Sequence, residues 1–195
     1  SAQNNLGVLY ENGWGVKRDY ARARTWYEKA AAQGNAVAQT NLGMMYESGN
    51  GVKQDFARAR AWYEKAVTQG NARAQSNLGM LYEKGRGVKR DYAQARSWFE
   101  KAAAQGDVIA QINLGMLYEK GWGVERDYAR AKALYEQATA TAPIESAAKA
   151  YYTLGTIYEQ GRLGIPRDIT EARTMYYYAA GLGHTGAKAK LRQLR

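Results

Sequence analysis

Cysteine is absent from the 195 residues, and the chain contains one histidine and two prolines. Without cysteine, neither a disulfide framework nor a thiolate zinc site can form. No apolar run approaches the roughly 20 residues that a membrane-spanning helix requires. No signal peptide is visible, but the chain opens at Ser1 inside an expected helix. We therefore expect a fragment of a longer protein, and its compartment stays open.

The residue arrangements that common enzymes use are also missing. The one histidine, His184, lies at the start of the terminal helix, where we expect it to serve as a helix-start residue. No histidine–aspartate pairing could activate a serine, and no glycine-rich loop opens on a strand to hold a phosphate. We therefore expect no catalytic activity, no cofactor and no metal site.

What the sequence does contain is a repeat marked by the dipeptide Leu-Gly. The first three intervals between its copies are 36 residues and the fourth is 40. The copies are Leu6-Gly7, Leu42-Gly43, Leu78-Gly79, Leu114-Gly115 and Leu154-Gly155. A fixed period of this size indicates stacked helix pairs.

Each repeat predicts two helices, which we call helix A and helix B. Between Ala38 and Gly49, apolar residues fall at i, i+4 and i+7, which is one stripe of helix A. Between Asp55 and Gly70, they fall at i, i+3, i+4 and i+7, which gives helix B. Glycine ends each helix, and Asp55 can cap the free amides at the start of helix B.

The glycine of the Leu-Gly dipeptide lies inside helix A, where it costs about 1 kcal/mol relative to alanine. The same cost recurs in all five repeats, so a structural gain must offset it. We expect that the missing Cβ lets helix A approach the bulky residues of helix B, which are Trp62 and Tyr63 in the second repeat.

This pattern resembles the Sel1-like repeat, a relative of the tetratricopeptide repeat, over nearly the whole chain. The residues that carry the resemblance are Ala38, Leu42-Gly43, Tyr46, Gly49-x-Gly51-Val52, Asp55, Ala59, Trp62-Tyr63, Ala66 and Gly70. The resemblance implies an all-α fold, a right-handed α-solenoid of antiparallel helix pairs with about eleven helices. It also implies a protein that assembles or tethers protein partners. The lack of cysteine departs from the disulfide-stapled branch of that family.

We expect one solenoid over residues 1–195. Its repeats lie near 1–35, 36–71, 72–107, 108–146 and 147–183, followed by a C-terminal capping helix at 184–195. Four residues are added around Pro143, which one extra helical turn could absorb. The fifth loop has one extra residue, in Gly161-Arg162-Leu163-Gly164, and Leu134 replaces the tryptophan of helix B in the fourth repeat.

The net charge of +10 suggests an acidic polymer, either polysaccharide or nucleic acid, as one class of partner. The basic residues recur on helix B, which we expect to form the convex wall. Several are followed four positions later by an acid, as in Arg24–Glu28 and Arg60–Glu64. We therefore favour a solvated outer face and keep acidic-polymer binding as the alternative function.

The inner face predicts a different partner, a protein or peptide held in a concave groove. Two columns vary while the scaffold stays fixed, and three methionines in a row form an adaptable apolar strip. The hypothesised groove residues are Asn4, Val8, Thr40, Met44, Arg73, Ser76, Met80, Ile112, Met116 and Tyr152. The alternative is that this column completes the packing between repeats. We expect a monomer with no small-molecule substrate and favour a protein partner over nucleic acid.

Three further sets of residues have two interpretations each. Trp14 and Trp122 could be exposed loop anchors, or each ring could fold back over the neighbouring turn. The repeated asparagines beside the core could bind a ligand, but a structural hydrogen-bond network explains them better. A glutamate row, which includes Glu47 and Glu119, could imitate catalytic carboxylates, yet stacked repeats place them ~10 Å or more apart.

Overall fold

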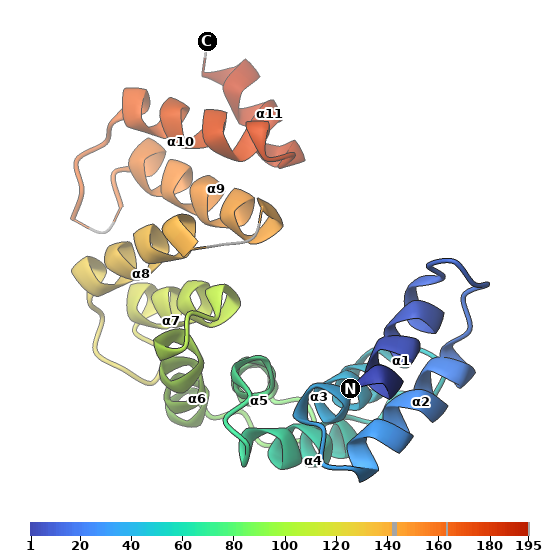
Figure 1. The fold of residues 1–195 in the computed structure, drawn as a ribbon. Helices are drawn as coiled ribbons and strands as arrows, with labels where there is room; N and C mark the ends of the chain where they lie inside the picture. The colour runs from blue at the N-terminus through green and yellow to red at the C-terminus, as the bar shows by residue number, and fades with distance from the viewer. Residues whose placement is uncertain (142–143, 163, 195) are drawn as a thin grey trace. The chain divides into compact units, whose positions relative to one another are not determined.

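The computed structural model describes residues 1–141, 144–162 and 164–194. Within these ranges the chain forms eleven helices and no strand (Figure 1), which confirms the expected all-α fold and helix number. None of the described helices is both long enough and apolar enough to cross a membrane. The helices are α1 (Ala2–Asn12), α2 (Tyr20–Ala32), α3 (Ala36–Ser48), α4 (Phe56–Val67), α5 (Ala72–Lys84), α6 (Tyr92–Ala104), α7 (Val108–Lys120), α8 (Tyr128–Thr141), α9 (Ile144–Gln160), α10 (Ile169–Gly181) and α11 (Thr185–Gln193).

The chain divides into two compact units, Ser1–Trp98 and Phe99–Arg195. In the first unit, α1 pairs with α2 and α3 with α4, and each helix B also packs against the next helix A. In the second unit, α7 pairs with α8 and α9 with α10 in the same way. This consecutive packing of helix pairs is the arrangement of an α-solenoid.

The helix ends form where the sequence signals predict them. Helix A of the second repeat, α3, ends at Gly49, whose φ of 79° is the left-handed conformation that glycine adopts without strain. Helix B, α4, begins after Asp55, whose Oδ1 accepts a hydrogen bond of 2.9 Å from the backbone N–H of Arg58. His184 caps α11 in the same manner, because its Nδ1 accepts from the N–H of Ala187.

Every loop between helix A and helix B is closed by the same backbone hydrogen bond. The N–H of the aspartate before helix B donates to the carbonyl of the tyrosine in helix A. The pairs are Asp19–Tyr10, Asp55–Tyr46, Asp91–Tyr82, Asp127–Tyr118 and Asp168–Tyr158, at 2.9 to 3.1 Å. The two ends of each loop are therefore fixed, although the fifth loop has one residue more than the others.

The glycine inside helix A lies directly against an aromatic ring of helix B. A Cβ added to Gly43 would lie 2.4 Å from Cε1 of Tyr63, a side chain with no exposed surface. The same contact joins Gly7 to Tyr27, Gly115 to Tyr135 and Gly155 to Tyr176. The close approach is thus confirmed, and the three atoms nearest to the Cβ position of Gly43 all belong to the tyrosine. Trp62 packs instead against the core of the preceding helices.

The four residues added before the fifth repeat lengthen its helix A. Helix α9 has 17 residues, against 13 in α3, α5 and α7, so one extra turn absorbs them. Pro143 and Leu163, the two irregularities noted in the sequence, lie outside the described residues. The terminal helix α11 packs Leu191 against the core formed by α10 and α11.

Two substitutions of glycine by alanine should differ in their effect on stability. We expect Gly43→Ala to lower the free energy of unfolding by about 2 kcal/mol, because the new methyl group overpacks against a buried ring. Gly181→Ala should leave stability unchanged or raise it by a few tenths of a kcal/mol, because nothing lies within 4 Å of its Cβ position and alanine favours helix. Urea denaturation would measure both, and equal effects would contradict the close-contact explanation.

Candidate interaction surface

The glutamate row bonds to the tyrosines that pack on the glycines. The hydroxyl of Tyr63 donates to Oε2 of Glu47 at 2.8 Å. The same bond joins Tyr27 to Glu11 at 2.5 Å, Tyr135 to Glu119 at 2.9 Å and Tyr176 to Glu159 at 2.5 Å. These carboxylates therefore serve as acceptors within their own repeats, which gives them a structural role.

The tyrosine hydroxyls in these bonds remain protonated. Burial raises the pKa of Tyr63 far above its ordinary value of 10, and the charge of Glu47 raises it further. Burial and Glu11 raise the pKa of Tyr27 in the same way, whereas the charge of Arg73 acts on both tyrosines in the opposite direction.

A cation from the following repeat contacts three of the glutamates. Arg86 lies 3.8 Å from Glu47, and Lys190 lies 2.9 Å from Glu159. In the second unit, Arg162 forms an ion pair with Glu119. Each of these three carboxylates thus joins helix B of its own repeat to the next repeat.

Four of the ten residues predicted to line the groove are buried, and this corrects their expected exposure. They are Asn4, Thr40, Ser76 and Ile112. Asn4 accepts a hydrogen bond of 3.2 Å from the side chain of Asn41, which gives this one member of the repeated asparagines a structural partner. The Thr40 hydroxyl is bonded to the carbonyl of Ala36 and lies 3.2 Å from Oδ1 of Asn71. At Asn4 and Thr40, a contact comes from the next repeat or from the residue that caps its first helix, which accounts for part of their burial.

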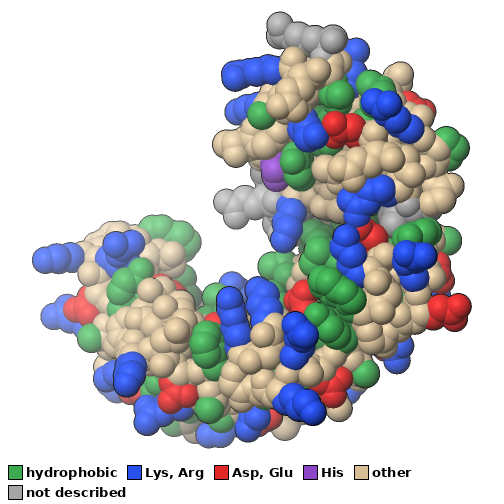
Figure 2. All heavy atoms as spheres, turned by 180° about the vertical axis from the view of Figure 1, so that it is seen from behind, with side chains coloured by type: hydrophobic (Ala, Val, Ile, Leu, Met, Phe, Trp, Pro, Cys, Tyr) green, Lys and Arg blue, Asp and Glu red, His purple; other side chains and the backbone are tan. Residues whose placement is uncertain are grey.

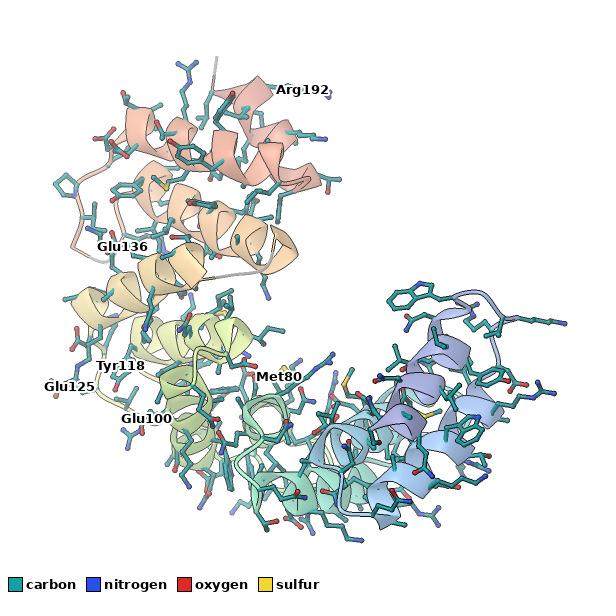
Figure 3. All side chains as sticks on the ribbon, viewed as in Figure 1. Met80, Glu100, Tyr118, Glu125, Glu136 and Arg192 are labelled. Carbon is teal, nitrogen blue, oxygen red and sulfur yellow. The ribbon has the colours of Figure 1, made fainter. Side chains whose placement is uncertain are left out.

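The other six predicted groove residues keep some exposed surface. Arg73 is exposed, and Val8, Met44, Met80, Met116 and Tyr152 are half-buried. Figure 3 labels Met80 on α5. The Tyr152 ring stacks on the ring of His184 at a centroid distance of 4.2 Å. Val37 and Ile109, which helical spacing also places on the inner face of helix A, are nearly half exposed near the start of α3 and α7.

The two loop tryptophans differ in exposure. The side chain of Trp14 is 63% exposed and that of Trp122 is 39% exposed, so neither ring is buried by its turn. Both remain accessible to a partner, Trp14 more so.

Basic side chains on helix B are largely matched by neighbouring groups. Arg24 and Arg60 each lie 3.4 Å from the glutamate four residues on, and Lys132 does the same with Glu136. Lys29 and Lys65 lie over the rings of Trp26 and Trp62. Figure 2 shows acidic side chains among the basic ones on the face in view. Such a surface is only weakly attractive to a polyanion, because its charges are partly compensated.

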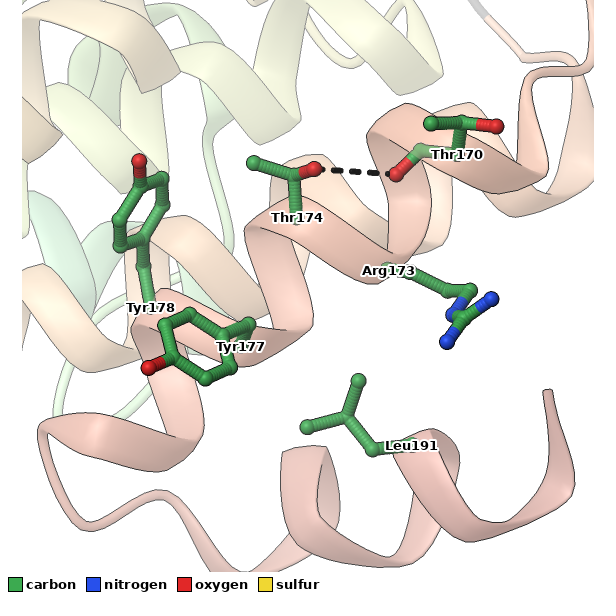
Figure 4. Close-up of a pocket in the computed structure, with 6 residues that line it drawn as sticks. All are labelled: Thr170, Arg173, Thr174, Tyr177, Tyr178 and Leu191. Atoms are coloured by element: carbon green, nitrogen blue, oxygen red, sulfur yellow. Dashed lines mark hydrogen bonds between the residues drawn. The ribbon is translucent and has the colours of Figure 1, made fainter. Parts of the chain in front are cut away.

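A cleft between α10 and α11 lies where the arginine–glutamate pair of helix B is absent, and the sequence prediction missed it. It has a volume of about 320 Å³ and is lined by Thr170, Arg173, Thr174, Tyr177, Tyr178 and Leu191 (Figure 4). Arg173 occupies the position of Arg24, but the residue four positions later is Tyr177, which is 69% exposed, instead of a glutamate. That replacement was visible in the sequence and could have identified the cleft.

A family model described as the Sel1 repeat matches the chain five times, at residues 1–35, 36–71, 72–107, 108–140 and 148–184. The chain is a Sel1 repeat protein. Proteins built from Sel1 repeats are generally protein-interaction scaffolds without catalytic activity. In the described part of the chain, no group of three or more histidine, aspartate or glutamate residues could hold a metal ion.

Solved Sel1 repeat structures resemble the chain closely. A Sel1 repeat protein from Oxalobacter formigenes is 38% identical with a TM-score of 0.85; the match covers 97% of this chain and 75% of that one. The c5321 protein, a protective antigen present in uropathogenic Escherichia coli strains, is 39% identical with a TM-score of 0.80. The match covers 97% of this chain and 40% of c5321, so the chain spans less than half the length of that protein.

A more distant likeness concerns the fold alone. Cysteine rich protein B of Helicobacter pylori is 24% identical with a TM-score of 0.52, over 70% of this chain and 98% of that one. A comparison with curated proteins found no match.

The ion pair that attaches α11 should make stability depend on pH. Burial raises the pKa of Glu159, but hydrogen bonds from Tyr176 and Lys190, with the charges of Lys190 and Arg167, lower it more, so the net shift is downward. A carboxylate with a lowered pKa stabilises the folded state above its unfolded pKa, about 4.3, and this contribution is lost as the pH falls through the folded pKa.

We therefore expect Glu159→Gln to lower the Tm at pH 7, and the gap in Tm to the wild type to shrink as the pH falls through the folded pKa of Glu159, where the wild-type carboxyl becomes protonated too. Thermal melts followed by circular dichroism over a series of pH values downward from pH 7 would measure the gap. A gap in Tm that does not change across the acidic range would show that the charge of Glu159 is not the stabilising element.

Proposed function

We propose that the chain is a scaffold that binds a partner protein or an extended peptide along the exposed faces of its A helices, in the concave groove of the solenoid. The observation that carries this proposal lies in the first unit. There the exposed Val37 and Arg73 belong to neighbouring A helices that also present the half-buried Met44 and Met80. A mixed apolar and basic strip on rigid helices suits a segment with apolar anchors.

The charges on this face favour a partner segment that also has an acidic residue. Glu11 and Glu47 are already engaged by tyrosine hydroxyls, and Arg86 lies beside Glu47. The exposed guanidinium of Arg73 could therefore pair with a carboxylate of the partner. The methionines can adjust to side chains of different shape, because the thioether chain is flexible and polarisable.

Binding of an acidic polymer through the convex face is the second candidate. It rests on the net charge of +10, and the local pairing of Arg24, Arg60 and Lys132 with glutamates weakens it. The two functions differ in their response to salt. Binding to a polyanion should weaken steeply as salt is added, whereas an apolar groove should be nearly insensitive.

The groove proposal can be tested with peptides selected on the wild-type protein from a random displayed library. Met44→Ala combined with Met80→Ala, both in the first unit, should weaken binding of the selected peptides at least tenfold, because truncated anchor residues typically cost 1–3 kcal/mol or more. Affinity would be measured by fluorescence anisotropy, after circular dichroism has shown that the variant is folded.

The matched control removes charge from helix B. Arg24→Gln combined with Arg60→Gln should leave peptide binding within twofold of wild type. If this control abolishes binding while the methionine pair does not, the groove proposal is wrong and the acidic-polymer function replaces it.

A further inference from the structure

The second glycine of the loop between helix A and helix B normally packs on the preceding repeat. A Cβ added to Gly51 would lie 2.5 Å from Cβ of Tyr20, and one added to Gly87 would lie 2.7 Å from Cβ of Phe56. Both distances are shorter than atoms tolerate. In the first unit, each of these loops is therefore pressed against the first turn of the previous helix B.

The fifth loop does not make this contact. Gly164 holds the position of Gly51 and Gly87, yet nothing lies within 4 Å of its Cβ position. This loop has one residue more than the others, although it is closed by the same bond, from Asp168 to Tyr158 at 2.9 Å. Gly164 therefore lacks the contact with the previous helix B that the shorter loops make.

A pocket lies beside Gly161, Arg162 and Gly164 of this loop. It lies wholly in the second unit, has a volume of about 450 Å³, and is lined by Glu119, Lys120, Arg126, Tyr128, Gly161, Arg162 and Gly164. Three of these side chains are cationic and one is anionic. The pocket is thus bounded by polar groups of one predominant charge and by the backbone of two glycines.

The one acid in the pocket is already compensated. Glu119 accepts a hydrogen bond from Tyr135 at 2.9 Å, forms an ion pair with Arg162 and lies 3.3 Å from Lys120. Arg126 lies over the ring of Tyr128, 5.0 Å from its centroid. Glu125 lines an adjoining pocket instead of this one. The lining residues therefore have an excess of two positive charges.

We propose that this pocket binds a small oxyanion, a phosphate group that is either free or carried as a monoester on a small molecule. Arginine and lysine side chains donate charge-assisted hydrogen bonds to phosphate oxygens, and arginine can do so with two parallel N–H groups. An open, polar pocket of this size admits a phosphate together with a small organic group. The site is separate from the proposed groove and does not depend on it.

The repeat provides a matched control for these charges. Lys84 and Arg90 hold the same positions as Lys120 and Arg126 one repeat earlier, where the following loop, Gly121 to Val124, has the ordinary length. The same cations thus occur twice in the sequence, and only the later pair is followed by the longer loop. The extra loop residue, in addition to the charge, is what the proposal requires.

The experiment titrates the full chain with inorganic phosphate and with glucose 6-phosphate by isothermal calorimetry at constant ionic strength. We expect Lys120→Gln combined with Arg126→Gln to weaken binding at least tenfold. Lys84→Gln combined with Arg90→Gln should change it less than twofold. Stronger binding of glucose 6-phosphate would identify a monoester as the ligand, and equal or stronger binding of inorganic phosphate would identify the free ion.

A second variant tests whether binding depends on the length of the loop as well as on the cations. Deletion of Leu163 restores the ordinary loop length and keeps every cation, so it should also weaken binding at least tenfold, with folding checked by a thermal melt. If the folded deletion variant binds as wild type does, or if the two charge pairs have equal effects, the proposal is overturned. It is equally overturned if neither probe binds the wild-type chain.

Discussion

The contact between a glycine in helix A and a tyrosine ring in helix B is the constraint on which the rest of each repeat depends. The missing Cβ at Gly43 leaves room for the Tyr63 ring, and the ring brings its hydroxyl to Glu47. Glu47 in turn lies beside Arg86 of the next repeat. One close approach therefore fixes the crossing of two helices, places a buried hydroxyl and orients a carboxylate that joins adjacent repeats.

Much of this architecture could be read from local sequence, because its signals are local. Period, glycine ends and aspartate caps each depend on a few neighbouring residues, and the structure places them as predicted. The choice between Trp62 and Tyr63 as the partner of Gly43 could not be predicted, because both residues belong to the apolar stripe of helix B and the local pattern does not show which of them faces helix A. The bond from Tyr63 to Glu47 spans 16 residues and depends on how the two helices cross.

The candidate surface was harder to predict for a related reason. Helical spacing shows which side of a helix faces its own repeat. Thr40 is buried and also contacts Asn71, which caps the first helix of the next repeat, and a pattern within one repeat does not contain that information. What remains exposed varies from repeat to repeat, as Arg73 and Val37 show. The scaffold and the recognition residues are thus separated: tyrosines and glutamates hold the repeats, and the remaining helix A positions are free to change.

The bond between the aspartate before helix B and the tyrosine of helix A has a wider consequence. Because it holds the two ends of every loop together, residues can be gained between them without shifting either helix. Each repeat therefore offers one site at which insertions are tolerated and at which new surface can evolve independently of the core. Protein engineering could therefore vary the loops one at a time while the helices of the scaffold stay unchanged.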